Sequence, residues 1–314
     1  MVAGSLIVSL VACGGGTGSS GQEATIDDVV AQQAVELASS AIPICHSGAG
    51  FRAAPPVGES ASFRLLQVLR SRGYLQGEGT VANFLPPTKP DDELGDCGGR
   101  VTFPSYNHSN GTTTGTVSFQ NFCTINESTG NRNTVNGTAS FVDAGTPSAS
   151  GPITTSLEAT SPSGFTVIEQ TTTGTTLSTE RLTFTDFRYV PGVPGGSPTA
   201  SNPDRVTLED ASVTDVDEGK TYRQSNFSAS GYNTPSGGQV QTFSGRTHLP
   251  NGDYVNVSTT SPITLDANGN VLSGQITFSG AGGTTAIVTL VPGSIVQATL
   301  TVNGIPVTNV PACR

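Results

Sequence analysis

Charge is scarce in this chain, and its scarcity excludes two classes of protein. Only 12% of the 314 residues are Asp, Glu, Lys or Arg, so the chain is unlike an ordinary disordered tail, which combines high charge with few β-forming residues. The 14 Lys and Arg residues are spread along the sequence. Nucleic-acid binding needs such residues clustered against the phosphates. With a net charge of −10, no nucleic-acid partner is expected.

The motifs that mark common catalytic and metal sites are also missing. The sequence contains no His-Glu-x-x-His, no nucleophile elbow and no Gly-rich phosphate loop. It has no Cys-x-x-Cys pair either, so we expect no structural metal, no haem and no other cofactor. His46, His108 and His248 lie far apart, and we interpret them as surface or turn residues. The chain is therefore not expected to be an enzyme.

Alternating apolar and polar residues are plentiful, and residues 272–302 carry the clearest run. Ile276 and Phe278 alternate with polar neighbours, and the same alternation returns over 286–290 and 296–302. A strand with this pattern has one dry and one wet face. Three consecutive strands are therefore predicted here.

The turns between these three strands predict their register. A three-residue Pro-Gly-Ser loop places Leu290 opposite Val296, whereas a two-residue loop would put the apolar rows of the two strands on opposite faces. A five-residue loop before it places Phe278 opposite Ala286. In this register Leu300 lies on the dry face and is predicted to be buried.

The region after Arg100 carries β signals throughout. Asn-Gly pairs, which favour tight hairpin turns, begin at five positions: Asn110, Asn136, Asn251, Asn268 and Asn303. We predict a mainly β fold, a long antiparallel meander of about twelve strands. At that number a twisted sheet forms a curled sheet, an open barrel or two layers.

Two short helices are predicted before the β region. The first covers about 25–42, with a capping box at Thr25, and the second covers 60–72. From residue 25 on, the predicted organisation is a helical segment with a Pro-rich linker (25–94) and a β-rich domain (95–314).

The N-terminus carries a motif with a known counterpart. Residues Leu10-Val11-Ala12-Cys13 resemble the lipobox of bacterial lipoproteins, and the Gly/Ser run that follows is typical of a tether. The resemblance implies a signal peptide over residues 1–12 that is cleaved before Cys13, and a Gly/Ser tether over 13–24. It also implies lipid attachment at Cys13 and a membrane partner. In such lipoproteins Asp after the Cys often marks inner-membrane retention, so Gly14 implies the outer membrane. The stretch from Gly245 to Leu265 is similar to exported proteobacterial proteins of unknown role.

Four cysteines remain once Cys13 is set apart. In an exported chain an even set predicts two disulfides, with three connectivities open. The preferred pairing is Cys97–Cys123, because the two residues flank one predicted hairpin. Cys45 would then pair with Cys313.

Three glutamates are the best candidates for chemistry. Glu158, Glu169 and Glu180 are predicted on three successive strands, joined by turns at 161–164 and 173–174, and all on one face. Paired carboxylates about 5 to 10 Å apart are the apparatus of glycoside hydrolysis. The simpler interpretation is the wet face of an exposed sheet, since such faces routinely carry charge.

Three functions from different classes follow. The first is a lipid-anchored envelope protein with a binding or structural role, whose ligand is a polymer or a partner protein. The second is a polysaccharide-active hydrolase that uses the glutamate face. The third is a periplasmic carrier that encloses an apolar ligand within a curled sheet, near Phe243 and Phe278.

Overall fold

The structure is a computed structural model of the whole chain. It describes residues 21–27, 30–31, 89, 91–125, 130–146, 153–194, 196–217, 219–249, 251–267, 271–291 and 297–307. Within these ranges no helix has the length and apolar character needed to cross a membrane.

Fourteen strands make up most of the described chain. They are β1 (Glu93–Leu94), β2 (Arg100–Ser109), β3 (Thr112–Ile125), β4 (Arg132–Thr146), β5 (Ile153–Gln170), β6 (Thr176–Val190), β7 (Asp204–Asp215), β8 (Lys220–Asn233), β9 (Gln239–His248), β10 (Tyr254–Leu265), β11 (Val271–Ser279), β12 (Thr285–Val291), β13 (Gln297–Val302) and β14 (Ile305–Val307). A short 3-10 turn, η2 (Ala281–Gly283), joins β11 to β12.

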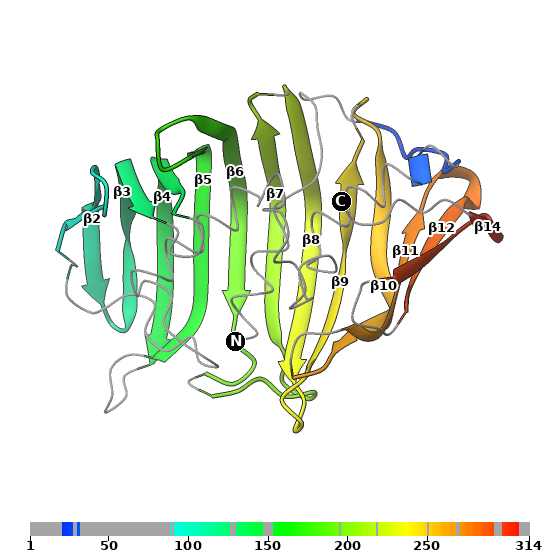
Figure 1. Cartoon of the computed structure of the whole chain (residues 1–314). Coiled ribbons are helices and arrows are strands. Elements are labelled where there is room, and N and C mark those ends of the chain that lie inside the picture. Colours follow the sequence, from blue (N-terminus) through cyan, green and yellow to red (C-terminus); the bar gives the residue numbers. More distant parts are fainter. Residues whose placement is uncertain are drawn as a thin grey trace.

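The strands form one sheet in which each is antiparallel to the next. Their order in the sheet is their order in the sequence, from β1 to β14. The first and last strands lie at opposite ends, so the sheet is curved but not closed (Figure 1). The predicted antiparallel meander is confirmed. Of the three predicted forms, two separate layers are excluded for the described strands, because all of them belong to one unclosed sheet.

Irregularities in the middle of the long strands accompany this curvature. The register shifts between Phe119 and Phe122 in β3, and in β8 it shifts between Ser225 and Ser228. A bulge adds residues to one strand only, which bends that strand and increases its local twist. At Asn226 the backbone takes a positive φ of 50°, a conformation that Asn tolerates better than most residues.

One face of the sheet, called the apolar face below, carries the core. Its buried side chains form clusters along the sheet, over β2–β7, β5–β8 and β10–β13. Completely buried examples are Val101, Phe122, Val135, Val167, Val206, Val255, Ile276, Phe278 and Leu300. Burial of each large side chain stabilises the fold by about 1.5–3 kcal/mol, so this face supplies most of the driving force.

The opposite face, called the polar face below, is lined by hydroxyl groups. Five pairs of Ser and Thr hydroxyls are hydrogen-bonded across neighbouring strands at 2.7–3.0 Å: Ser105–Thr116, Thr183–Ser212, Thr214–Thr221, Ser230–Thr242 and Thr260–Thr277. Cross-strand Thr and Ser pairs of this kind stabilise a sheet by a few tenths of a kcal/mol each. The polar face is therefore ordered but largely uncharged.

The last three hairpins follow the predicted faces but only part of the predicted register. Phe278 lies opposite Ala286, as predicted. Leu290, however, lies opposite Ala298 and not Val296, because the link between β12 and β13 spans five residues instead of three. A shift of two residues keeps every side chain on the same face, so Leu300 is still buried.

The Asn-Gly pairs have two different roles. Asn110 and Asn303, each followed by Gly, make two-residue hairpin turns with positive φ at both positions, as a type I′ turn requires. Asn136 carries the same dipeptide but lies inside β4, where Gly137 begins a shift in register. Its side-chain Oδ1 accepts a hydrogen bond from the Asn121 amide at 2.7 Å. A bulge and a turn both need an unusual φ, so the same dipeptide suits either.

A segment near the N-terminus is bonded to the sheet at the start of β10. The backbone of Tyr254 pairs with Gln22 and Ala24, and Ile26 is buried in the cluster over β10–β13. The predicted tether thus meets the sheet at Gln22, before its predicted end at residue 24. The Asp27 side chain accepts a hydrogen bond from the amide of Val30 at 2.9 Å. The remainder of both predicted helices lies outside the described residues.

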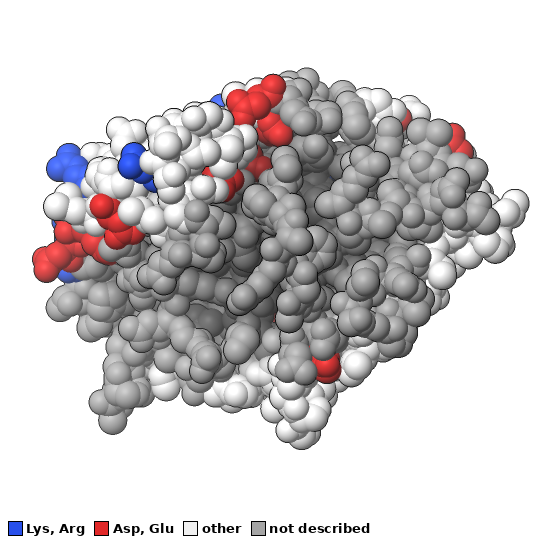
Figure 2. All heavy atoms as spheres, in the orientation of Figure 1, with Lys and Arg blue, Asp and Glu red and all other residues white. Residues whose placement is uncertain are grey.

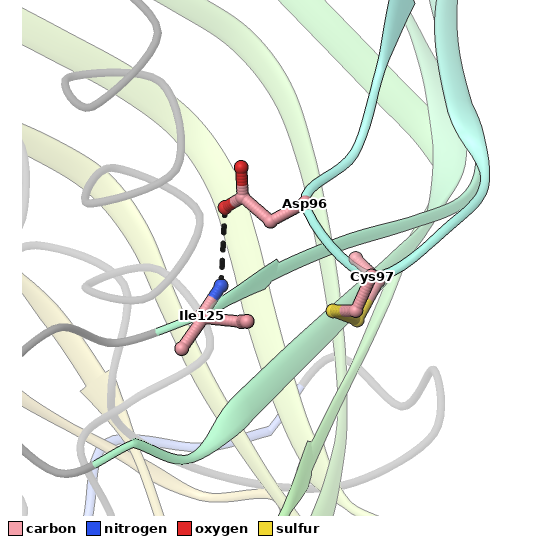
Figure 3. The surroundings of a disulfide bond; sticks show 4 residues. Asp96, Cys97 and Ile125 are labelled. Atoms are coloured by element: carbon pink, nitrogen blue, oxygen red, sulfur yellow. Dashed lines mark hydrogen bonds between the residues drawn. A yellow bond between two sulfur atoms is a disulfide. The ribbon is translucent and has the colours of Figure 1, made fainter.

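One of the predicted disulfides is present. Cys97 and Cys123 are joined, with their Cα atoms 5.1 Å apart. The loop that carries Cys97 is also bonded to β3 through the Ile125 amide, which donates to the Asp96 carboxylate at 3.2 Å (Figure 3). The bridge therefore fixes the loop between β1 and β2 against β3. Cys13, Cys45 and Cys313 lie outside the described residues.

Candidate functional site

The three candidate glutamates do not gather on one face. Glu158 and Glu169 both belong to β5, which runs without a turn from residue 153 to 170. The predicted turn at 161–164 is instead a wide bulge: β5 advances from Ser161 to Phe165 while its partner β6 moves only from Phe184 to Leu182. Proline in a strand interior is confined to such bulges, and Pro162 occupies this one.

This bulge assigns the glutamates to different environments. Glu158 lies on the polar face and forms an exposed ion pair with Arg188 at 3.4 Å. Glu180 lies opposite Val167 on the apolar face, where it is buried. Glu169 follows on that same face, and its Oε1 accepts a hydrogen bond from Asn131 at 2.8 Å. The three-glutamate face predicted from the sequence is therefore wrong; only Glu169 and Glu180 remain neighbours.

A different set of side chains forms the most organised polar cluster described. It lies on the polar face across four neighbouring strands and is called the diagonal cluster below. Its members are Asp210 on β7, Arg223 and Ser225 on β8, Arg246 and His248 on β9, and Tyr254 on β10. The register places Asp210, Ser225 and Arg246 in one cross-strand row and His248 opposite Tyr254 in the next.

Each neighbouring pair of strands in this cluster is joined by one diagonal contact. Arg223 Nε donates to Asp210 Oδ1 at 2.7 Å, which links β8 to β7. Ser225 Oγ lies 2.8 Å from His248 Nε2, which links β8 to β9.

The third contact is a cation–π interaction that links β9 to β10. The guanidinium carbon of Arg246 lies 4.6 Å from the centre of the Tyr254 ring. Such contacts stabilise by about 0.5–1 kcal/mol at exposed sites. Together the three contacts tie β7, β8, β9 and β10 together on their polar face.

His248 is the most constrained member of the cluster. Its side chain is 8% exposed, and burial lowers the pKa of the imidazole below its ordinary value of 6.5. The charges of Arg223 and Arg246 lower the pKa further, while Asp210 and a hydrogen bond to the Gly252 backbone oppose them. The ring is accordingly neutral at pH 7.

Two carboxylates lie beside the cluster on the exposed surface. A hydrogen bond with Asp186 raises the pKa of Glu209, and the negative charges of Asp186 and Asp210 act in the same direction. Asp186 has a positive φ of 48° within β6, so another strand irregularity lies next to the cluster.

The sequence-based interpretation of the histidines as surface or turn residues is wrong for His248. The residue ends β9, and the fold places it against Ser225, 23 residues earlier in the chain. His108 lies on β2 and bonds to the Thr113 hydroxyl at 2.8 Å. His46 is outside the described residues. The sequence carries one weak signal for this cluster: Arg223 and Ser225 are two residues apart on β8, so they lie on the same face of that strand. Whether Arg246 of β9 lies near them depends on the register of the hairpin.

Charged groups elsewhere do not form a competing site on the visible face. Among the described residues shown in Figure 2, charges are few, and cations and carboxylates lie interspersed near the first strands. The described chain also contains no group of three or more His, Cys, Asp or Glu side chains able to hold a metal ion.

Comparisons with known proteins add no assignment. No protein-family model matched the chain, and neither did any curated protein sequence. The function therefore has to be argued from the residues and the geometry above.

Proposed function

We propose that the protein is a lipid-anchored protein of the bacterial cell envelope, in the outer membrane, whose polar face binds an envelope polymer. The observation that carries the binding role is the run of five cross-strand hydroxyl pairs on that face. Hydroxyl groups both donate and accept hydrogen bonds, so a broad array of them matches a polymer rich in hydroxyls. An uncharged glycan fits best, because the chain's net charge of −10 repels acidic polymers.

The N-terminal segment supports the anchored placement. The backbone contacts of Gln22 and Ala24 with Tyr254 fix the chain at the start of β10. From Cys13 to Gln22 the chain can extend at most about 30 Å, given about 3.3 Å for each residue. A lipid on Cys13 would therefore hold the sheet close to the membrane while leaving the polar face accessible to an extended polymer.

Neither alternative function gains a specific observation. A glutamate-based hydrolase needs its two carboxylates facing one substrate, and Glu158 lies on the face opposite Glu169 and Glu180. A carrier needs space beside Phe243 and Phe278. Instead Phe243 stacks on Phe227 with ring centres 5.9 Å apart, and Phe278 is fully buried by its neighbours.

Two measurements test the proposal separately. For the anchor, Cys13→Ser should move the protein from the membrane fraction to the soluble fraction. If the variant fractionates with membranes as the parent does, the anchor is wrong.

For the binding role, the soluble Cys13→Ser protein should co-sediment with insoluble envelope polysaccharide. Replacing the hydroxyl pair Ser230–Thr242 and the pair Thr183–Ser212 by alanine should weaken that binding at least several-fold. The matched control is alanine at Thr171 and Thr173, an exposed hydroxyl pair in the turn between β5 and β6. Equal binding by the two multiple variants would contradict the polar face as the binding surface.

A further inference from the structure

His248 and a serine hydroxyl are in hydrogen-bond contact. The Nε2 atom of the ring lies 2.8 Å from Ser225 Oγ. A neutral imidazole carries its proton on one nitrogen and leaves the other as an acceptor, so Nε2 accepts from the hydroxyl when the proton is on Nδ1.

In that tautomer the Ser225 hydroxyl is the donor and Nε2 the acceptor. A nucleophile in hydrogen-bond contact with a base is the first requirement for nucleophilic catalysis.

We propose that Ser225 is an activated nucleophile and that Ser225 and His248 form a dyad that hydrolyses carboxylic esters. This activity goes beyond the proposed binding role and uses residues that the hydroxyl pairs do not include.

The surroundings of Ser225 favour a reactive position. Ser225 is followed directly by the β8 bulge, where Asn226 has a positive φ of 50°. Bulges commonly lie beside active sites, because they turn a side chain away from the regular ladder. Arg246 is directly opposite Ser225 in the register, and within the described chain its guanidinium is paired with Tyr254 and with no carboxylate. It is the cation available to a developing negative oxygen.

The reaction is balanced by the residues of the dyad and water. The Ser225 Oγ forms a bond to the ester carbonyl carbon while its proton passes to His248 Nε2. The alkoxide then leaves and takes that proton, which gives an acyl-serine and a free alcohol. Water, deprotonated by the same Nε2, attacks the acyl-serine, releases the carboxylic acid and restores the hydroxyl. Because Ser225 is 9% exposed, only small acyl groups are expected to reach it.

A fluorophosphonate probe tests the nucleophile without knowledge of the substrate. The Ser225 Oγ displaces fluoride from phosphorus, and peptide mapping of the folded protein locates the adduct. We expect labelling at Ser225, no labelling there in Ser225→Ala, and a rate about 10²-fold lower in His248→Gln. Ser230 on the same strand is the internal control, since its hydroxyl bonds Thr242 at 2.8 Å and has no imidazole partner. Hydrolysis of p-nitrophenyl acetate should follow the same order.

The outcomes separate a reactive serine from a structural hydrogen bond. Labelling of the parent that falls in His248→Gln, with both variants melting within a few degrees of the parent, supports the dyad. No adduct on Ser225 in the parent protein overturns it. An unchanged labelling rate in His248→Gln also overturns the dyad, because it would mean that His248 does not act as the base. If the variants unfold, the labelling of the parent protein still tests the proposal. Labelling of Ser225 that is no faster than labelling of Ser230 in the parent overturns it.

Discussion

Leu300 lies directly opposite Val288 on the neighbouring strand, and both are buried on the apolar face. Its neighbour Thr299 points to the other face and is exposed. The two residues are adjacent in the chain, but one side chain lies in the protein core and the other in water, because successive side chains of a strand alternate between its faces.

Truncation at these two positions should therefore have unequal effects. Leu300→Ala should lower the free energy of unfolding by about 2–5 kcal/mol, as expected for a cavity in the core. Thr299→Ala should change it by less than about 0.5 kcal/mol. Urea denaturation of both variants measures the difference. Equal losses of stability in the two variants would mean that the register assigned to β13 is wrong.

Removal of the disulfide should destabilise the first strands. Replacing Cys97 and Cys123 together by Ala should lower the free energy of unfolding by about 2–5 kcal/mol, because the unfolded chain regains the freedom of the closed loop. Denaturation of the oxidised parent with and without reductant should reproduce the same loss. A free thiol at either position in the native protein would contradict the pairing.

Stability should fall in mildly acidic solution through His248. Its pKa is lowered in the folded protein, whereas the unfolded chain titrates at the ordinary 6.5. Below about pH 6.5 the unfolded state therefore binds more protons, and the free energy of unfolding decreases as pH falls until the folded ring also protonates. The groups around the ring are Arg223, Arg246, Asp210 and Tyr254.

A matched variant isolates this contribution. His248→Asn removes the titrating group, so its denaturation midpoint should depend less on pH than the parent's between pH 7.5 and 5. Carboxylates elsewhere titrate in both proteins and cancel in the comparison. Parallel pH profiles for the two proteins would exclude His248 as the source.

The turn residue Asn303 should couple the N-terminal segment to the sheet. Its Oδ1 accepts the Thr285 amide at 2.8 Å, its Nδ2 donates to the Ile26 carbonyl at 3.1 Å, and its φ is 49°. Asn303→Gly should lose the two side-chain bonds, worth about 0.5–1.5 kcal/mol each.

Asn303→Ala should lose the same two bonds and also strain the backbone. A Cβ in the left-handed region costs about 1 kcal/mol more, so Ala should be the less stable variant by roughly that amount. Thermal unfolding of both variants measures the order. If Ala proves as stable as Gly, the positive φ at residue 303 is incorrect.

The sequence by itself determined the class of fold and the faces of the strands over 272–302. Alternation along these residues predicted which side chains are buried, and the pairing of Phe278 with Ala286 followed from a loop of known length. The Cys97–Cys123 bridge followed from the hairpin that the two cysteines flank. These features are local: a period of two assigns faces, and a loop of known length assigns register.

Only the tertiary structure decided the features that depend on strand bulges or on contacts between residues far apart in the sequence. A shift of two residues leaves the dry face unchanged, so alternation could not distinguish Val296 from Ala298 as the partner of Leu290. Bulges and turns favour the same residue types, so the sequence predicted a turn beginning at Ser161, in the middle of β5. That turn assigned Glu158 to the wrong face relative to Glu169 and Glu180.

The diagonal cluster was beyond sequence reasoning for a related reason. Ser225 meets His248 only because β8 and β9 pair in one register, and burial then sets the protonation of the ring. The open form of the sheet likewise depends on twist and bulges accumulated over fourteen strands. No single stretch of residues encodes that sum.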